Sequence, residues 1–491
     1  MESTKNYYDN LIIGAGLSGI AAAHRLQTEL PHKTFKILEG RDSIGGTWDL
    51  FRYPGIRSDS DMYTLGYSFS PWYGKKTLAD GQSILSYIKS TASKYRLEEH
   101  IQLSTEVKSI KWYSDKSLWI VNCINSKTKE SIIYSCRFIF LCTGYYDYSQ
   151  GYTPQFKDQE KFTGTIIHPQ FWPERYDPTN KRIIVIGSGA TAITLVPELA
   201  KKASHVIMLQ RSPTYILPLP DIDHLSNFIM DIFPSSIGHF INRVKNIFFM
   251  NLMYILCQFL PTLMKTILLG IVKLFLGPSY NIDTHFTPYY KPWDERLCIV
   301  PDGDLFKSIK SGNVTVKTGE ILNWNEQGIQ IKNREKNNEP ELLKCDTIIT
   351  ATGLVIKLGG GIQIFVDDKE IESLSHHFMY KGIMISDIPN LVMAIGYTNQ
   401  SFTLKVDLIS KYIVRVWKYM DTHHYTSFRP VYTSKDDGEP LLNLTSGYIK
   451  RAIDKWPKQG KMSPWKYYQN YLYDIFEFYY GQVNDGVMVF K

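Results

Sequence analysis

The chain of 491 residues has only six cysteines, and no two of them form a C-x-x-C pair: Cys123, Cys136, Cys142, Cys257, Cys298 and Cys345. Metal centres and redox-active dithiols therefore have little support, and we expect a reducing, cytoplasmic compartment. Histidine spacing does not suggest a metal site either. His376–His377 and His423–His424 are adjacent pairs without a third ligand at a useful distance.

Long runs of one charge and long uninterrupted apolar runs are also missing. The net charge of +7 comes without a basic tract, which disfavours nucleic acid and fits anionic small ligands or an anionic membrane surface. The polar start MESTKNYYDN leads into no signal-peptide core, so we do not expect secretion.

The most apolar region, Ile247–Phe275, contains Asn251, Gln258 and Pro261. It predicts two helices that break near Pro261 and lie partly buried, partly against lipid or substrate; a true membrane span is the alternative. Any lipid contact is expected to be peripheral, through residues 243–276, on the inner face of the membrane.

The chain is long enough for two or three domains, and 44% hydrophobic residues indicate a packed globular protein. Aromatic residues make up 14% of the chain, which points to aromatic-lined pockets.

The N-terminal segment predicts a strand, a glycine turn, a helix and a second strand. NLIIG (Asn10–Gly14) is a short buried strand that leads into GAGLSG, IAAAHRL and then TFKILE, which ends at Glu39. Glycines in such a turn let the backbone approach a pyrophosphate at the helix N-terminus, and the acid can accept ribose hydroxyls. A glycine turn of an unrelated α/β unit is the alternative. The pattern favours a dinucleotide site that includes Gly14, Gly16, Gly19 and Glu39.

The pattern returns in KRIIVIGSGATAITLVPELA, and the next strand, HVIMLQ, ends at Gln210. Arg211 stands where the first unit has its acid, and an arginine there suits a 2′-phosphate, so NADPH is preferred over NADH. A surface arginine is the alternative reading. The residues predicted at this second site are Gly187, Ser188, Gly189, Thr191, Ala192, Arg211 and Ser212.

Two such sites, one with an acid and one with an arginine, predict FAD and NADPH in one α/β chain. RFIFLCTG and CDTIITATG, ending at Gly144 and Gly353, predict strands where a cofactor lies beside bare backbone. We expect two Rossmann-like domains with a helical insert in the second. The expected ranges are 1–150 and 380–491 for FAD, 151–219 and 291–379 for NADPH, and 220–290 for the insert.

Between the glycine motifs, Lys161–Pro173 reads KFTGTIIHPQFWP and fits the pattern FxGxxxHxxxWP. This resembles the fingerprint of Baeyer–Villiger monooxygenases, the class B flavoprotein monooxygenases. GGTWDLFRYPGIRSDSDMYTLGYSF, HFTPYYKPWDERLCIVPDGDLF, LQRSPTY and AIGYTNQSFTLK are similar to the subgroup that includes the ethionamide-activating monooxygenase. The resemblance spans about Leu11–Lys405.

The resemblance implies that the fingerprint lies in the connection between the domains and couples their movement. Its residues are Phe162, Gly164, His168, Trp172 and Pro173. We therefore expect a linker hydrogen bond from His168 rather than general-base chemistry, and packing of the linker by Trp172 and Pro173.

The resemblance also implies an NADPH- and O2-dependent FAD monooxygenase that inserts oxygen next to a ketone carbonyl, through a C4a-peroxyflavin, to give an ester or lactone. Arg296 is the position implied to stabilise the peroxy anion and hold the nicotinamide, with Asp59 as its partner. An ion pair of Arg296 with Asp294 or Glu295, and a turn cap by Asp59, are the alternatives from the residues alone.

The segment GTWDLFRYPGIRSDSD is expected to lie along the flavin, with the turn Tyr53–Gly55 directing Asp59 toward Arg296 and with Arg57 in a structural role. The residues expected to contact FAD are Gly14, Gly16, Gly19, Glu39, Gly46, Thr47, Trp48, Asp59, Tyr63, Val107, Thr143 and Gly144.

The expected substrate is a small apolar ketone or organosulfur compound, together with O2. One alternative is a flavin monooxygenase that oxygenates thioether or thioamide sulfur or amine nitrogen. The other is a membrane-associated flavoprotein that acts as an NADPH oxidase or interaction module without productive oxygen transfer.

Overall fold

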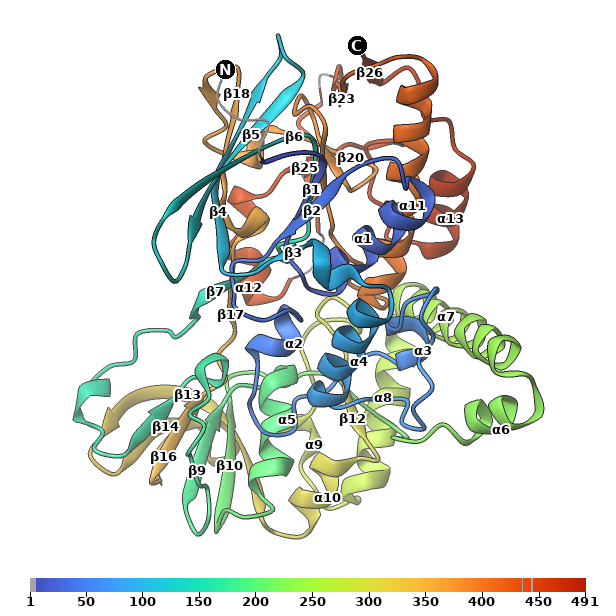
Figure 1. Cartoon of the computed structure of the whole chain (residues 1–491). Coiled ribbons are helices and arrows are strands. Elements are labelled where there is room, and N and C mark those ends of the chain that lie inside the picture. The colour runs from blue at the N-terminus through green and yellow to red at the C-terminus, as the bar shows by residue number, and fades with distance from the viewer. Residues whose placement is uncertain (1–5, 435, 443–444) are drawn as a thin grey trace.

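The computed structural model describes residues 6–434, 436–442 and 445–491. Two sheets organise these residues, one in the upper half of Figure 1 and one in the lower half. This confirms the expected α/β class with two nucleotide-binding units and a helical insert.

The first sheet is built around β1, a strand that packs on both faces and pairs in parallel with β2 and β6. Helices α1 (Leu17–Glu29) and α11 (Phe402–Thr422) lie together on one side of it (Figure 1). Across the sheet the order is β19 (Lys369–Glu370), β18 (Gln363–Val366), β4 (Thr105–Tyr113), β5 (Leu118–Asn125), β6 (Ser131–Leu141), β1 (Tyr7–Ile13), β2 (Phe35–Leu38) and β3 (Ile101–Gln102), and β22 (Leu391–Met393) also pairs with β6.

The second sheet has a parallel part that carries the second glycine motif, and an antiparallel extension. Helix α5 (Ala190–Leu199) follows β9, and α10 (Asp304–Lys310) precedes β13. The order is β15 (Glu339–Lys344), β14 (Gly328–Asn333), β13 (Val314–Asn325), β10 (His205–Gln210), β9 (Arg182–Ile186), β16 (Thr347–Thr350) and β8 (Thr165–Ile167).

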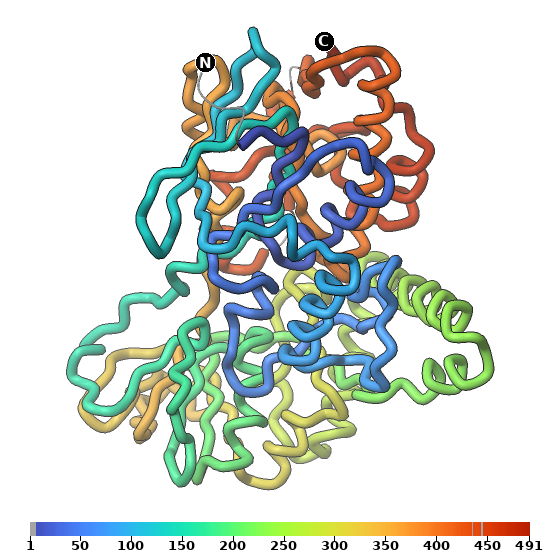
Figure 2. The backbone as a smooth tube through the Cα atoms, viewed as in Figure 1, coloured from blue at the N-terminus to red at the C-terminus, as the bar shows by residue number. Residues whose placement is uncertain are grey.

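The chain passes between the two halves through a pair of antiparallel strands, β7 (Tyr146–Gly151) and β17 (Leu354–Ile356) (Figures 1 and 2). Directly after it, β18 pairs in parallel with β4 of the first sheet. Residues 363–370, which the sequence assigned to the second nucleotide domain, therefore add strands to the first sheet. We propose that the first domain resumes at β17 instead of at residue 380.

The helical insert consists of four helices: α6 (His224–Ile232), α7 (Ser235–Phe259), α8 (Pro261–Leu276) and α9 (Ile282–His285). One residue, Leu260, separates the end of α7 from Pro261 at the start of α8, and the two helices meet at 116°. Proline fits the first turn of α8 because its missing N–H has no intrahelical partner there. In the described part of the chain, no single helix has the length and hydropathy of a membrane span. Among these residues, only this bent pair has that length and hydropathy when its two helices are taken together.

Shorter elements complete both halves. On the N-terminal side these are α2 (Thr47–Leu50), α3 (Met62–Leu65) and α4 (Gly81–Lys94), and in the second half β11 (Ile216–Leu219) pairs with β12 (Cys298–Pro301). The C-terminal part adds β20 (Met379–Tyr380), β21 (Met384–Ile385), β23 (Phe428–Pro430), β24 (Glu439–Pro440), α12 (Gly447–Lys450), β25 (Lys458–Gln459), α13 (Tyr471–Tyr479) and β26 (Met488–Phe490).

A buried ion pair joins α13 to α11. Lys405 Nζ lies 2.6 Å from Asp474 Oδ2, and the two side chains are 0% and 6% exposed. The Tyr397 hydroxyl donates to the same carboxylate at 2.5 Å. Burial lowers the pKa of Lys405, so the partner carboxylate is what keeps this amine charged inside the protein.

Lys405→Met should lower the free energy of unfolding by about 3–5 kcal/mol, because it leaves a buried carboxylate without its cation. Urea unfolding followed by circular dichroism measures this. The double variant Lys405→Met/Asp474→Leu should be less destabilised than the single one. If the free energy of unfolding of Lys405→Met lay within about 1 kcal/mol of the wild-type value, the Lys405–Asp474 contact would not be a buried ion pair.

Candidate active site

The turn between β1 and α1 requires glycine for steric reasons. Gly14 has φ = 108°, and a Cβ there would lie 2.4 Å from the Cys142 carbonyl oxygen on the neighbouring strand end. A Cβ at Gly19 would lie 1.9 Å from the Gly14 oxygen, so this glycine permits the close approach of α1 to β1.

Glu39 lies at the end of β2, where the sequence predicts an acid for ribose hydroxyls. It is buried and accepts hydrogen bonds from the Ala15 N–H at 2.7 Å and the Arg41 N–H at 2.9 Å. Burial raises the pKa of Glu39, and the two backbone donors oppose that rise. The carboxylate also borders the main cavity, so it can receive a ligand hydroxyl.

That cavity has a volume of about 560 Å³ and reaches from the first glycine turn to α5 in the second half of the molecule. Thr191 and Thr194 face it from α5. The predicted site residues that line it are Gly14, Gly16, Glu39, Gly46, Thr47, Trp48, Asp59, Val107, Thr143, Gly144, Thr191 and Arg296.

Tyr63, which was expected to contact FAD, lies elsewhere. It is on α3, its side chain is buried, and its ring packs against His239 of α7 with the centroids 5.6 Å apart. The motif around it is therefore used to seat the helical insert.

The second glycine turn joins β9 to α5. Gly187 has φ = 136°, and a Cβ there would lie 2.3 Å from the Ala351 carbonyl oxygen. Gly189 is different: it is the N-cap of α5, it makes no side-chain cap, and a Cβ there would meet nothing within 4 Å. The first amides of α5 thus face open space, which suits a phosphate.

The other residues predicted at the second site lie around this turn and after β10. The Ser188 hydroxyl donates to the Ser212 carbonyl at 2.8 Å, which ties the turn to the segment after β10. Ala192 is fully buried against the sheet. Arg211 is exposed directly after β10, where its guanidinium is free to approach a ligand phosphate.

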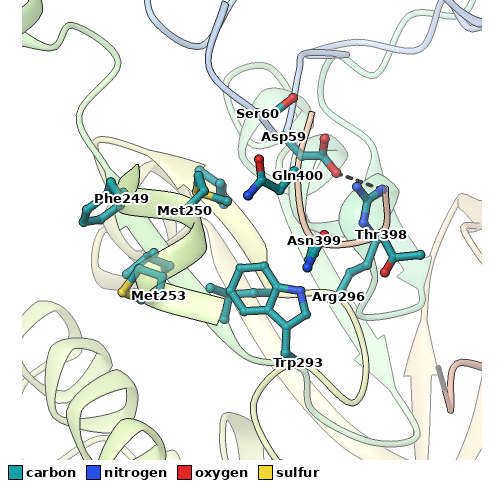
Figure 3. A pocket seen from close by; sticks show the side chains of 13 residues that line it. Asp59, Ser60, Phe249, Met250, Met253, Trp293, Arg296, Thr398, Asn399 and Gln400 are labelled. Carbon is teal, nitrogen blue, oxygen red and sulfur yellow. Dashed lines mark ion pairs between the residues drawn. The ribbon is translucent and has the colours of Figure 1, made fainter. Parts of the chain in front are cut away.

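Asp59 and Arg296 come together although 236 intervening residues separate them in the sequence. Arg296 Nη1 lies 3.2 Å from Asp59 Oδ2, and the side chains are 40% and 42% exposed (Figure 3). Both border the main cavity, so their exposed surfaces face its interior. The Asp59 carboxylate raises the pKa of Arg296 above its ordinary value, so the guanidinium stays charged.

The loop that carries Asp59 is clamped against the second half of the molecule. A Cβ at Gly55, where φ is 75°, would lie 2.3 Å from Glu198 Cγ on α5, so the turn packs tightly there. Arg57 Nη1 donates to Asp304 Oδ2 at 2.7 Å, at the start of α10. Arg57 is thus an ion-pair link between the first unit and the second.

A smaller pocket of about 30 Å³ adjoins the pair (Figure 3). Met250 and Met253 reach it from α7, and Trp293, Asn399 and Gln400 complete its wall. Trp293 has φ = 76°, a strained left-handed conformation of the kind that collects at functional sites.

Three polar side chains of this wall have buried atoms without a hydrogen-bond partner among the described residues: Trp293 Nε1, Asn399 Oδ1, and Oε1 and Nε2 of Gln400. Such groups are rare in folded proteins, and a bound ligand is one way to satisfy them. The pocket therefore combines an apolar side from α7 with polar groups next to Arg296.

The fingerprint residues lie in the connection from β7 to β8 and directly after β8. The His168 ring packs on Gly151, where a Cβ would lie 1.9 Å from it, and its Nδ1 accepts from the Gln170 N–H at 3.2 Å. Burial lowers the pKa of His168, which favours the neutral ring.

The rings of Phe162 and Trp172 and the backbone at Gly164 lie close to neighbouring groups, whereas Pro173, which was expected to pack the linker, lies at the surface. The Phe162 ring meets Trp324 edge-on at 6.0 Å, and the Trp172 ring meets Tyr176 at 5.5 Å. A Cβ at Gly164 would lie 2.4 Å from the Asp346 oxygen.

The main cavity fits a flavin dinucleotide. Glycines line it where a side chain would fill the space: a Cβ at Gly46 would lie 3.2 Å from the Gly16 Cα. Two buried polar atoms on its wall, Arg41 Nε and Ser58 Oγ, have no partner among the described residues. Polar atoms of a dinucleotide would satisfy them.

The sequence did not single out every residue of the site. Gln400 and Phe402 lie in AIGYTNQSFTLK, a segment that carried the resemblance, and Tyr145 follows the strand end at Gly144. A sequence motif could therefore have pointed to all three residues. Trp293 lies in HFTPYYKPWDERLCIVPDGDLF, another segment that carried the resemblance, so it had a signal too. Met250 and Met253 had none, because an apolar residue in a hydrophobic helix looks the same whether it lines a pocket or a core.

Comparisons with known proteins agree with this geometry. The profile of the flavin-binding monooxygenase-like family matches residues 10–427. The FAD-containing monooxygenase EthA of Mycobacterium tuberculosis is 44% identical over 98% of this chain and 96% of its own length. The probable FAD-binding monooxygenase AlmA of an Acinetobacter species is 44% identical with the same two coverages.

A solved structure of oxidized steroid monooxygenase bound to NADP has the same fold, with a TM-score of 0.78, 18% identity and 99% of each chain covered. The resemblance found in the sequence motifs is thus confirmed across nearly the whole length. The chain belongs to the flavin-binding monooxygenase-like family.

Proposed function

We propose that this chain is an NADPH- and O2-dependent FAD monooxygenase that inserts one oxygen atom next to the carbonyl of an apolar ketone. In balance, ketone, O2, NADPH and a proton give ester or lactone, NADP+ and water. The observation that carries the proposal is the Asp59–Arg296 ion pair, which lies where the large cavity meets the small apolar pocket.

FAD is assigned to the first glycine turn, with Glu39 at the ribose and the backbone around Gly46 and Gly144 beside the rest of the cofactor. NADPH is assigned to the first turn of α5, with Arg211 and Ser212 at the 2′-phosphate. When bound, the two cofactors supply the electrons that activate O2.

Arg296 acts in this scheme as a fixed positive charge. Negative charge develops on a ketone oxygen when its carbonyl is attacked, and a preorganised guanidinium stabilises that charge. Because Asp59 raises the pKa of Arg296, the side chain does not serve as a proton donor. Asp59 orients it and neutralises part of its charge.

The substrate is placed where the small pocket meets the main cavity, because about 30 Å³ alone has room for no more than one small group. The methionine wall of the small pocket suits an apolar body, and the unpartnered atoms of Asn399, Gln400 and Trp293 can receive polar groups. Attack at a carbonyl depends on an anion-stabilising cation more than sulfur oxygenation does, which is why we favour ketones over thioethers.

The direct test is to incubate the FAD-loaded protein with NADPH, O2 and an apolar ketone, and to identify the products by mass spectrometry. An ester or lactone is expected. NADPH consumption that yields only H2O2 would contradict the proposal. Formation of a sulfoxide from a thioether, without an ester from any ketone, would favour the sulfur alternative.

Arg296→Ala should lower kcat for ester formation by at least about 100-fold, the usual cost of removing a charge-stabilising group. Arg429→Ala, at an exposed arginine on β23, is the matched control and should behave like the wild type. Undiminished ester formation by Arg296→Ala would refute the assigned role.

Gly189→Ala should leave the melting temperature unchanged, because the new Cβ meets open space, yet weaken NADP+ binding by about tenfold or more by blocking the pyrophosphate. Gly187→Ala should instead destabilise the fold, through its positive φ and the contact with Ala351. Thermal unfolding and calorimetric titration with NADP+ separate the two. Normal NADP+ affinity in Gly189→Ala would argue against a nucleotide at α5.

A further inference from the structure

Helix α7 has its polar and apolar sides reversed relative to an ordinary surface helix. Its inward side carries Asn242, Arg243 and Asn246, all buried. A stripe of large apolar residues faces outward, and every member is at least 40% exposed: Phe240, Val244, Phe248, Leu252, Ile255 and Phe259.

Hydrogen bonds fix this orientation. Asn242 Nδ2 donates to the Ser226 carbonyl at 2.9 Å, and Asn246 Nδ2 donates to Asp61 Oδ1 at 2.8 Å. Arg243 Nη1 donates to the carbonyls of Tyr63 and Gly66 at 2.9 and 2.8 Å. Rotating the helix to bury its apolar stripe would break these bonds, so the exposed stripe belongs to the folded state.

The neighbouring helices also expose large apolar side chains. Phe228 and Ile232 of α6 are 61% and 57% exposed, and Leu263 and Leu274 of α8 are 53% and 84% exposed. Helices α6 and α7 project from the body at the right edge of Figure 1. We call the exposed apolar residues of α6, α7 and α8 the insert face. Exposed apolar surface on this scale is typical of a binding site.

The charged side chains of α7 and α8 are all basic, whereas α6 carries the exposed Asp231 at its end. Between Asp231 and Asp283 the sequence has no acidic residue, but it has two arginine or lysine residues on α7 and two on α8. Arg243 points inward, Lys245 pairs with Asp223 at 2.5 Å and Lys265 donates to the Pro288 carbonyl at 3.1 Å. The exposed Lys273 of α8 is therefore the cation best placed to attract an anionic partner.

We propose that the insert face seats the protein on an anionic lipid bilayer, with α7 and α8 lying in the interfacial layer of one leaflet. The helix pair matches a membrane span in length and hydropathy only when its members are taken together, and its 116° bend prevents a straight crossing. A protruding apolar surface beside the exposed Lys273 suits the boundary between head groups and acyl chains.

Helix α7 also links this surface to the small pocket. Phe249 is 45% exposed and lines the pocket that holds Asp59 and Arg296, next to Met250 and Met253. An apolar substrate dissolved in the bilayer would meet α7 at the entrance to the site. This delivery role rests on the proposed function, whereas the seating of the insert face does not.

The test is cosedimentation of the FAD-loaded protein, without NADPH, with vesicles of phosphatidylcholine alone or mixed with phosphatidylglycerol. The wild type should bind, and more tightly to the mixed vesicles. Phe240→Ser/Phe248→Ser should lower the partition coefficient by at least about tenfold, since two exposed rings that would enter lipid are lost. Ile133→Ser/Met462→Ser, at exposed apolar residues outside the insert, is the matched control and should bind like the wild type.

A wild type that stays in the supernatant would overturn the proposal, and so would a double phenylalanine variant that binds vesicles normally. Light scattering tests whether a second copy of the chain binds the insert face instead of lipid. Self-association through this face without vesicle binding would also overturn the proposal. For delivery, vesicles should accelerate turnover of a lipid-dissolved ketone by the wild type and not by the double variant, with a water-soluble ketone unaffected in both. Vesicle binding uses no turnover, so its failure is distinct from failure of the monooxygenase reaction.

Discussion

The contact on which the rest of the site depends is the ion pair between Asp59 and Arg296. Asp59 lies in a loop that follows the first nucleotide unit, and Arg296 lies in the segment that returns from the helical insert. Their 3.2 Å contact therefore needs both halves of the molecule to be held in one arrangement. The β7–β17 connection, the tight packing of Gly55 on α5 and the Arg57–Asp304 pair all contribute to that arrangement. The charge of a guanidinium is useful in catalysis only when it is preorganised, and these contacts supply the preorganisation.

The helical insert gives the pair its chemical surroundings. The inner side of α7 brings Met250 and Met253 to the pocket, while its polar residues anchor it to the loop and helix around Asp61 and Tyr63. The same motif that was expected to contact the flavin at Tyr63 thus positions the insert. The outer side of α7 remains apolar and exposed, so this one helix lies between the molecular surface and the charged centre of the site.

Much of the fold follows from local patterns in the sequence. The glycine turns could be predicted because backbone contacts at Gly14, Gly19 and Gly187 exclude a side chain, and such exclusions leave a short, recognisable motif. The break at Pro261 could be predicted for the same kind of local reason. The return of residues 363–370 to the first sheet could not, because β18 and its partner β4 are distant in sequence and their pairing leaves no local trace. The meeting of Asp59 and Arg296 came from family resemblance alone, and the partner of Arg57 had no signal at all. Met250 and Met253 could not be predicted as pocket residues, because tertiary packing decides which apolar residues of α7 face the pocket.

The most direct test of the central claim is the coupling ratio, the moles of ester formed per mole of NADPH consumed, compared between the wild type and Asp59→Asn. The substitution keeps the size of the side chain and removes the charge that orients Arg296. If the ion pair organises the reaction, the ratio should fall at least about tenfold, with the lost NADPH recovered as H2O2. An unchanged ratio in a correctly folded Asp59→Asn protein would contradict the account.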